Sequence, residues 1–211
     1  MVVAIIGILA SMLLPSLGKA KRIAKQTICI NNLKQIGLWI NMYGDDNDGA
    51  FPRAWKDELS WDDLLSDYDG RKLTQAQLDG YTPPVKSQDI TYKCALDFRK
   101  LANESTRTYA VNAEVIGDYP WGRAGVNNDT LNSTSSSILM SERIPSSSDN
   151  GSKSTLGDDE DCRAFTNVDL GSGGFPSWYS NHPKSDTLPW LFADIHIDIR
   201  GKNYFTTFTA Q

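Results

Sequence analysis

The first seventeen residues form an uninterrupted apolar segment. Residues 1–17 read MVVAIIGILASMLLPSL and carry no charged side chain. Such a run is typical of a membrane helix, a signal-peptide core or a buried core helix. It has no polar face, which argues against a soluble core helix, and no basic residues precede it, which argues against a signal peptide. We therefore expect membrane insertion, although the segment reaches only about 25 Å as a helix.

The apolar pattern continues beyond this segment as a helical stripe. Apolar or small residues recur at steps of three and four residues, with the basic residues largely off the stripe. Gly44 and the polar run 45–49 (DDNDG) are typical of a helix end. The pattern predicts one helix over residues 2–43, about 60 Å long, which must protrude from so small a protein. Its stripe consists of Leu17, Ala20, Ile23, Ala24, Thr27, Ile30, Leu33, Ile36, Ile40 and Tyr43.

Charge separates a stem from a head. Residues 18–34 carry five basic residues and no acidic one, whereas the 177 residues that follow carry 16 basic and 26 acidic residues. We divide the chain into a helical stem, 1–44, and a head, 45–211. Within the stem, 1–17 is the membrane-type part and 18–44 is the amphipathic part. The net charge of −5 argues against a partner nucleic acid.

The head is predicted to have an α+β fold. Ser60 and Asp63 have the spacing of a capping box, which predicts a short helix after Ser60. β-Branched and aromatic residues between turn formers predict short strands, and the clearest is 191–200, where isoleucines alternate with polar residues. Antiparallel strands packed on the amphipathic half of the helix give an α+β fold. The expected strands are 89–94, 107–111, 138–142, 191–200 and 204–209, and the last two form a hairpin through a turn at 201–203.

Several segments resemble one bacterial family. The segment 1–10 (MVVAIIGILA), followed by Pro15, resembles the N-terminal helix of type IV pilins and type II secretion pseudopilins. Further segments are similar to the pilin-like proteins abundant in planctomycete- and verrucomicrobia-type bacteria, namely 29–37, 43–52, 92–97 and 108–112.

The C-terminal part resembles that group's signature, a His, nine residues, then Asp-Gly-His. Here the corresponding residues are His182, Asp194 and His196. Eleven residues separate His182 from Asp194, and Ile195 replaces the signature glycine. Any chemistry tied to that glycine is therefore not expected in this chain.

The resemblance implies a pilin-like fold, a long protruding N-terminal helix packed by its C-terminal half on a small antiparallel sheet. It implies that the apolar half anchors the subunit in the bacterial inner membrane before assembly and then packs in the core of a helical filament. The family's basic leader and its Phe-Thr-Leu-Ile-Glu segment are not in this chain, so Met1 aligns inside the family's mature helix. The implied assembly residues are Val2, Val3, Ile5, Ile6, Ile8, Leu9, Met12, Leu13, Leu14, Pro15 and Leu17.

The resemblance also implies partners and a location. The partners are the lipid bilayer before assembly, prepilin peptidase, the inner-membrane pilus or secretion machinery, and copies of the same chain in a homopolymer. The location is the inner membrane at first, and then a periplasmic or cell-surface filament.

Three cysteines leave the redox state open. Cys29, Cys94 and Cys162 form no CxxC pair, and only two histidines accompany them, which argues against a zinc site. One disulfide with a free third thiol and three reduced, buried thiols both fit the count. The candidate disulfide is Cys29–Cys94, and the sequence leaves the pairing open.

Two clusters offer weaker candidate sites. The acidic run Asp158, Asp159, Glu160 and Asp161 could hold a structural Ca²⁺ through its carboxylate oxygens, although a solvated acidic loop is the simpler explanation. The aromatic residues Trp178, Tyr179 and Trp190 lie in loop-like sequence and could contact a partner or a sugar ring, or else cap a small core.

No enzyme is expected. His182 and His196 are the only histidines, and a polar strand face shared with Asp194 and Asp198 explains His196 without chemistry. No nucleophile-elbow, zinc-protease or phosphate-loop motif occurs. We expect a structural subunit of a type IV pilus-like or type II secretion pseudopilus filament. The alternative is a membrane-anchored extracytoplasmic module that binds carbohydrate or an adhesion ligand and does not polymerise.

Overall fold

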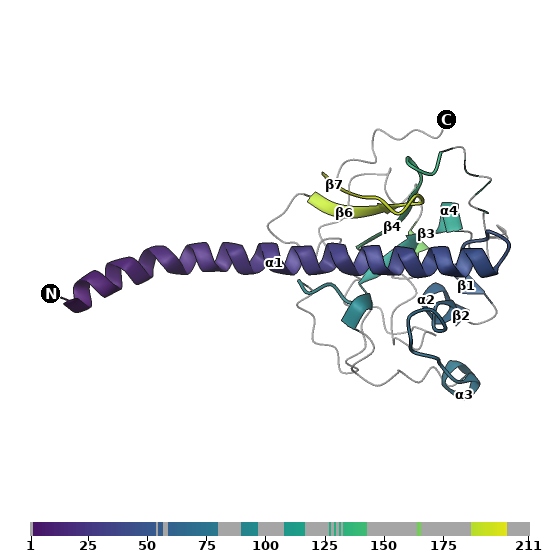
Figure 1. Ribbon diagram of the computed structural model, residues 1–211, viewed down its shortest axis with the longest axis horizontal. Helices are drawn as coiled ribbons and strands as arrows, with labels where there is room; N and C mark the ends of the chain where they lie inside the picture. The colour runs from purple at the N-terminus through teal and green to yellow at the C-terminus, as the bar shows by residue number, and fades with distance from the viewer. Residues whose placement is uncertain are drawn as a thin grey trace.

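A computed structural model shows one long helix joined to a small head (Figure 1). The helix, α1 (Val2–Asp46), runs along one side of the head and projects far beyond it. The structure describes residues 2–53, 55–56, 59–79, 90–96, 108–116, 127, 129, 131, 133–142, 164–165 and 187–201.

The helix α1 is continuous over 45 residues and passes through Pro15 without interruption. Its length is therefore about 67 Å. It ends three residues later than expected, in a turn where the backbone N–H groups of Asn47 and Gly49 both donate to the carbonyl of Gly44, at 3.0 and 2.9 Å. Gly49 has a φ of +79°, which glycine adopts without strain.

Only the C-terminal half of α1 is covered by the head. The first buried residue is Cys29, and residues 2–24 are all exposed. Half of the expected stripe, from Leu17 to Thr27, therefore lies outside the head. The buried side of the helix consists of Cys29, Asn32, Leu33, Ile36, Gly37, Trp39, Ile40 and Gly44.

The main sheet confirms the α+β fold. Its strands stand in the order β5-β3-β4-β6-β7. The pairs β3–β4, β4–β6 and β6–β7 are antiparallel, and the short edge strand β5 is parallel to β3. The strands are β3 (Tyr109–Asn112), β4 (Ile138–Glu142), β5 (Ala164–Phe165), β6 (Thr187–Phe192) and β7 (Ile197–Gly201).

The remaining elements are short. A two-stranded sheet pairs β1 (Trp55–Lys56) with β2 (Leu59–Ser60). In Figure 1 the strands β6 and β7 lie on one side of α1, and α2 and α3 lie on the other. The short helices are α2 (Trp61–Leu64), α3 (Gln75–Asp79), the 3₁₀ helix η2 (Ile90–Tyr92) and α4 (Ala113–Ile116).

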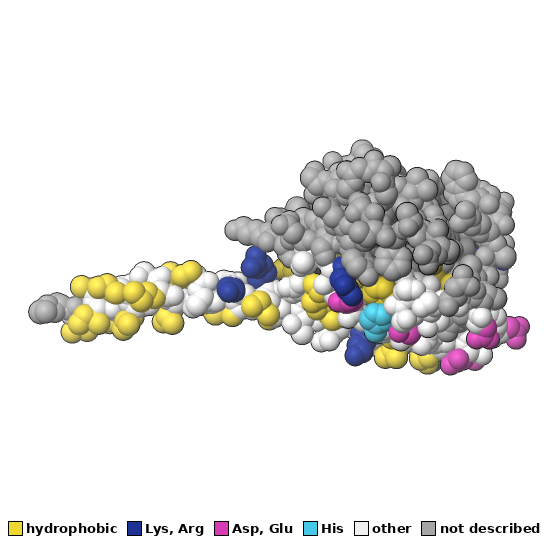
Figure 2. Space-filling view, turned by 90° about the horizontal axis from the view of Figure 1, so that it is seen from above, with side chains coloured by type: hydrophobic (Ala, Val, Ile, Leu, Met, Phe, Trp, Pro, Cys, Tyr) yellow, Lys and Arg dark blue, Asp and Glu magenta, His cyan; other side chains and the backbone are white. Residues whose placement is uncertain are grey.

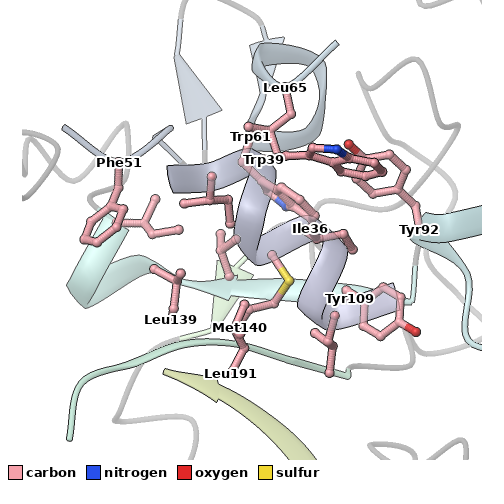
Figure 3. Packing of buried hydrophobic residues seen from close by; sticks show 14 of the residues in the cluster. Ile36, Trp39, Phe51, Trp61, Leu65, Tyr92, Tyr109, Leu139, Met140 and Leu191 are labelled. Atoms are coloured by element: carbon pink, nitrogen blue, oxygen red, sulfur yellow. The ribbon is translucent and has the colours of Figure 1, made fainter. Parts of the chain in front are cut away.

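The core forms between the buried side of α1 and the elements around it (Figure 3). Gly37 allows the closest approach, because a Cβ atom there would lie 3.1 Å from the Leu191 side chain of β6. On the other side of the helix, the Tyr92 ring lies 5.8 Å from the Trp39 ring and 5.7 Å from the Trp61 ring. The helix is therefore part of the core of the head.

A buried ionic network closes the α2 side of the core. The Nε atom of Arg71 lies 2.6 Å from Asp69 Oδ2, and the Tyr92 hydroxyl donates to the same oxygen at 2.6 Å. Arg71 also contacts the Asp62 carboxylate at 3.5 Å, and its guanidinium lies over the Tyr92 ring at 4.7 Å. The expected capping box is present, with both Ser60–Asp63 interactions made.

Of the five expected strands, two are wrong, two are confirmed, and 204–209 lies outside the described residues. Residues 89–94 contain the 3₁₀ helix η2 instead of a strand, because Tyr92 turns inward to pack between Trp61 and Arg71. Residues 191–200 form two strands joined by a tight turn. The expected strands 107–111 and 138–142 are confirmed as β3 and β4, with small differences at the ends of β3.

The turn between β6 and β7 explains the second error. The N–H of Ile195 donates to the Phe192 carbonyl at 2.9 Å, and the N–H of Phe192 donates to the His196 carbonyl at 3.0 Å. This is the pattern of a three-residue hairpin loop, whose last residue adopts the left-handed conformation. Ile195 occupies that position with a φ of +66°. An isoleucine there conceals the turn in the sequence.

Candidate assembly surface

The projecting part of α1 presents an apolar surface on all sides. The exposed fractions of its large side chains run from 55% for Ile5 to 83% for Val3. Its hydroxyl groups do not interrupt this surface, because Ser11 donates to the Ile8 carbonyl at 2.7 Å and Ser16 donates to the Leu13 carbonyl at 2.8 Å. The exposed side chains are Val2, Val3, Ile5, Ile6, Ile8, Leu9, Met12, Leu13, Leu14, Pro15 and Leu17.

This surface requires a cover. Soluble monomers rarely expose one continuous apolar patch of this extent, and such a patch marks a membrane or protein contact. The helix is long and apolar enough to cross a membrane, and its most apolar window is not buried anywhere in the head. Figure 2 shows the hydrophobic side chains along the projecting part.

A second apolar stripe continues along the covered half of α1, on the side opposite the head. Its members are 46–53% exposed although the other side of the same turns is buried. It was not expected from the sequence, although Leu17, Ala24 and Leu38 share one row of seven-residue spacing and Ile28 and Met42 share another. We call it the outer stripe; it consists of Ile28, Leu38 and Met42.

Four basic residues lie on one side of α1 where the projecting part meets the head. Lys19, Lys21 and Arg22 are exposed, and Lys25 is half-buried. At 100° per residue they lie within an arc of about 160° on the side of the helix that the head later covers. No acidic residue occurs between residues 2 and 44. We call these four residues the basic collar.

The opposite end of α1 is acidic. Asp45, Asp46 and Asp48 are all exposed, and we call them the acidic end. The Tyr68 hydroxyl donates to Asp46 Oδ2 at 2.9 Å. Burial, followed by this hydrogen bond and the negative charge of Asp46, raises the pKa of Tyr68 to about 12. In Figure 2 basic side chains lie where the projecting part meets the head and acidic side chains lie at the far end, and side chains of both kinds also lie between them.

Covalent and polar contacts fix the helix to the head where the projecting part ends. Cys29 of α1 and Cys94 form a disulfide with a Cα–Cα distance of 4.9 Å. The Tyr109 hydroxyl donates to the Cys29 carbonyl at 3.1 Å, and the Asn32 side chain donates to the Lys93 carbonyl at 3.1 Å. These contacts hold the stem and the head in one fixed relation.

Glu142 lies beside this disulfide. Within the described part of the chain, Cys29, Cys94 and Glu142 bring three ligand-type atoms within 4.8 Å of one another. Both sulfur atoms belong to the disulfide, so they do not offer thiolate ligands to a metal ion.

The histidine signature has a different geometry from the one expected. Asp194 and His196 do not share a strand face with Asp198, because Asp194 lies in the turn before β7. His196 Nδ1 lies 2.5 Å from Asp194 Oδ1, and the imidazole stacks on the Phe192 ring at 4.2 Å. Both side chains are exposed, so the pair caps the hairpin turn at the surface.

Trp190 is not a surface contact. The sequence interpretation placed it in a loop, but it lies in β6 and its exposed fraction is 0%. It packs in a small second cluster with Ala110, Ile138, Leu188 and Phe192. The other candidates lie outside the described residues, namely Asp158, Asp159, Glu160, Asp161, Trp178, Tyr179 and His182.

The chain has the general architecture of pilins, with a long apolar N-terminal helix packed by its C-terminal half on a small, mainly antiparallel sheet. No family model matches the chain, and no curated protein or solved structure is significantly similar to it.

Proposed function

We propose that this chain is a structural subunit of a bacterial filament of the type IV pilus or type II secretion pseudopilus kind. One observation carries the proposal, namely that residues 2–17 project from the head as a helix that is apolar and exposed on every side. A helix that served only to anchor the protein would not need a rigid joint to the head. Here the disulfide at Cys29 and the shared core provide one.

Burial of the projecting side chains supplies the assembly energy. Full burial of one Val, Leu or Ile side chain contributes about 1.5 to 3 kcal/mol. An exposed ion pair contributes only about 0.2 to 1 kcal/mol. Ten large side chains between Val2 and Leu17 therefore dominate any surface electrostatic term. The same side chains are stable in a bilayer before assembly, because lipid also removes them from water.

The proposed mechanism is mechanical and involves no catalysis by this chain. The helix first holds the subunit in the inner membrane, with the head outside the cytoplasm. An inner-membrane machine then moves the helix out of the bilayer and packs it against the helices of other copies. The product is a periplasmic or cell-surface filament whose centre consists of the apolar helices.

The alternative of a membrane-anchored module that binds carbohydrate or an adhesion ligand relied on three exposed aromatic residues. Trp190 is fully buried, and Trp178 and Tyr179 lie outside the described residues. We propose the structural role because the exposed apolar part of α1 supports it.

Point variants on the stem test the proposal. Ile5→Asn with Leu9→Asn places two amides on side chains that are 55% and 57% exposed. The matched control is Ile199→Asn, in β7 of the head, where the side chain is 45% exposed. Each variant is produced in a bacterium with a filament machine, and filaments sheared from the cells are measured by immunoblot. We expect loss of sheared protein for the stem variant and retention for the control. Equal amounts from both would contradict the proposal.

A further inference from the structure

The charges along α1 have a polarity that the apolar stem does not explain. The basic collar lies at residues 19–25 of α1, and the acidic end lies at residues 45–48, at the end of the same helix and in the turn that follows it. The two groups are separated by about 25 residues, or about 37 Å along the axis. They are too far apart to interact with each other within one chain, and apart from the half-buried Lys25 all of these residues are exposed.

Packing two stems side by side without an axial shift is unfavourable. Stems inserted in one membrane by one route point in the same direction. If two such helices packed at the same height, the four cations of one collar would lie at the same level as the four of the other. Like charges in contact repel, whereas a shift along the axis removes the conflict. Since no acidic residue precedes Asp45, a shift that reaches a carboxylate must be long.

A shift of about 25 residues matches apolar as well as charged segments. It places residues 3–17 of the upper copy beside residues 28–42 of the lower copy, where the outer stripe presents Ile28, Leu38 and Met42. The same shift places the collar beside Asp45, Asp46 and Asp48. Asp45 follows Leu38 by seven residues and so continues the same side of the lower helix.

The two surfaces also lie on the sides of the helix that such a contact requires. The collar lies on the head-facing side of its helix, and the outer stripe lies on the side opposite the head. An inner stem that turns its collar outward therefore meets the inward-facing outer stripe and acidic end of the copy below.

From these observations we propose that the outer stripe and the acidic end of one copy bind the apolar stem and the basic collar of the next copy, at an axial shift of about 25 residues. This contact is heterologous, so it does not close on itself and generates an open filament. The apolar contact supplies the affinity and the charges select the register, as charge complementarity does at other interfaces. The inference rests on the proposed function and adds the stagger between subunits.

Cysteine cross-linking measures the register directly. Arg22→Cys with Asp45→Cys places thiols at the two positions that the shift brings together. Arg22→Cys with Lys34→Cys is the matched control, because Lys34 is exposed on the same side of α1 about 11 residues earlier. Under mild oxidation of assembled filaments, we expect the first pair to give a ladder of cross-linked subunits. We expect the second pair to give no more cross-linked product than the unaltered chain. A ladder from the Lys34 pair alone would overturn the proposed shift.

Charge exchange separates register from folding. Lys21→Glu with Arg22→Glu, and Asp45→Lys with Asp46→Lys, should each reduce filament yield at least tenfold at low salt. The four substitutions together should restore it, whereas Asp79→Lys with Asp129→Lys, on exposed residues elsewhere, should leave it unchanged. An unchanged filament yield for all of these variants would overturn the inference and leave the proposed function standing.

Collar variants that lose binding to anionic-lipid vesicles but assemble normally would also overturn the inference, because the collar would then bind the membrane. An unaltered chain that never assembles would remove the proposed function itself.

Discussion

Ile195 shows how one residue can hold strain in exchange for packing. Its φ of +66° is left-handed, which costs a β-branched residue about 1 to 2 kcal/mol. Its side chain packs against the main core, and its Cδ1 atom would lie 3.3 Å from a Cβ atom placed on Gly37 of α1. The packing against α1 offsets the strained turn.

An alanine variant is usually more stable than the glycine variant at the same position, and we expect the opposite order of stability at Ile195. Ile195→Ala loses the packing and keeps the strain, whereas Ile195→Gly loses the packing and relieves the strain. We expect the glycine variant to have the larger free energy of unfolding, by about 1 kcal/mol. Urea unfolding of both variants measures the difference. An alanine variant that is more stable than the glycine variant would show that the turn is not left-handed.

Tyr92 predicts loss of stability at alkaline pH. Burial, together with the charges of Asp69 and Asp62, raises its pKa well above the ordinary value of 10.0, although Arg71 opposes this. The unfolded chain then loses the phenolic proton near pH 10 while the folded chain keeps it. The contribution of Tyr92 is therefore complete below pH 10 and decreases as the pH rises above it, by about 1.4 kcal/mol per pH unit.

The variant Tyr92→Phe tests this dependence. It lacks the ionisable proton, so its free energy of unfolding should decrease less than that of the unaltered chain between pH 9 and 11. Urea unfolding at the two values gives the comparison. Identical pH dependence in the two proteins would mean that Tyr92 is not buried in its neutral form.

Sequence reasoning at this scale succeeded where a side chain acts on its own backbone. Ser60 and Asp63 formed the expected capping box because that motif is local. The surroundings of Arg71 and Tyr92 could not be predicted, because they depend on segments that are distant in the sequence.

At the scale of elements, the disulfide joins α1 to the head. Cys29 and Cys94 are 65 residues apart, and closing a loop of that length stabilises the folded chain by about 4 kcal/mol in the chain-entropy account. The variant Cys29→Ala with Cys94→Ala should lose a free energy of unfolding of this order. Reductant should lower the free energy of unfolding of the unaltered chain by breaking this disulfide. It should have no such effect on the variant, which lacks the bond. A variant as stable as the oxidised chain would contradict a stabilising role for the bond.

Strand prediction failed where packing or turn chemistry overrode local preference. The turn at 193–195 contains no glycine, so the alternation of isoleucine and polar residues resembles one strand. The segment Ile90–Tyr92 has β-type residues but forms a 3₁₀ helix, because the Tyr92 ring packs against Trp61. The strand β4, which has no such conflict, was predicted with its observed bounds.

At the scale of the whole molecule, the projecting part of α1 is separable from the folded head. Residues 2–17 are exposed throughout and contribute nothing to the core of the head. Deletion of residues 2–17 should therefore give a soluble monomer with the same thermal unfolding midpoint as the detergent-solubilised full chain. Circular dichroism and sedimentation velocity measure both properties. A large drop in the midpoint would show that the stem supports the head.

The sequence predicted the protruding helix because 3.6-residue periodicity is visible without any tertiary information. It also predicted the packed side of the covered half, because Leu33, Ile36 and Ile40 of the expected stripe are buried. It did not predict that Leu38 and Met42, on the uncovered side, form a second apolar stripe.

Immunogold electron microscopy tests the central claim most directly. Bacteria with a filament machine would produce the full chain or the chain without residues 2–17, and antibodies against the head would label the preparations. The account predicts labelled filaments with the full chain and none with the deletion, although the deleted chain remains folded. A full chain that stays in the membrane, with no labelled filament under conditions in which the machine assembles its own subunit, would contradict it.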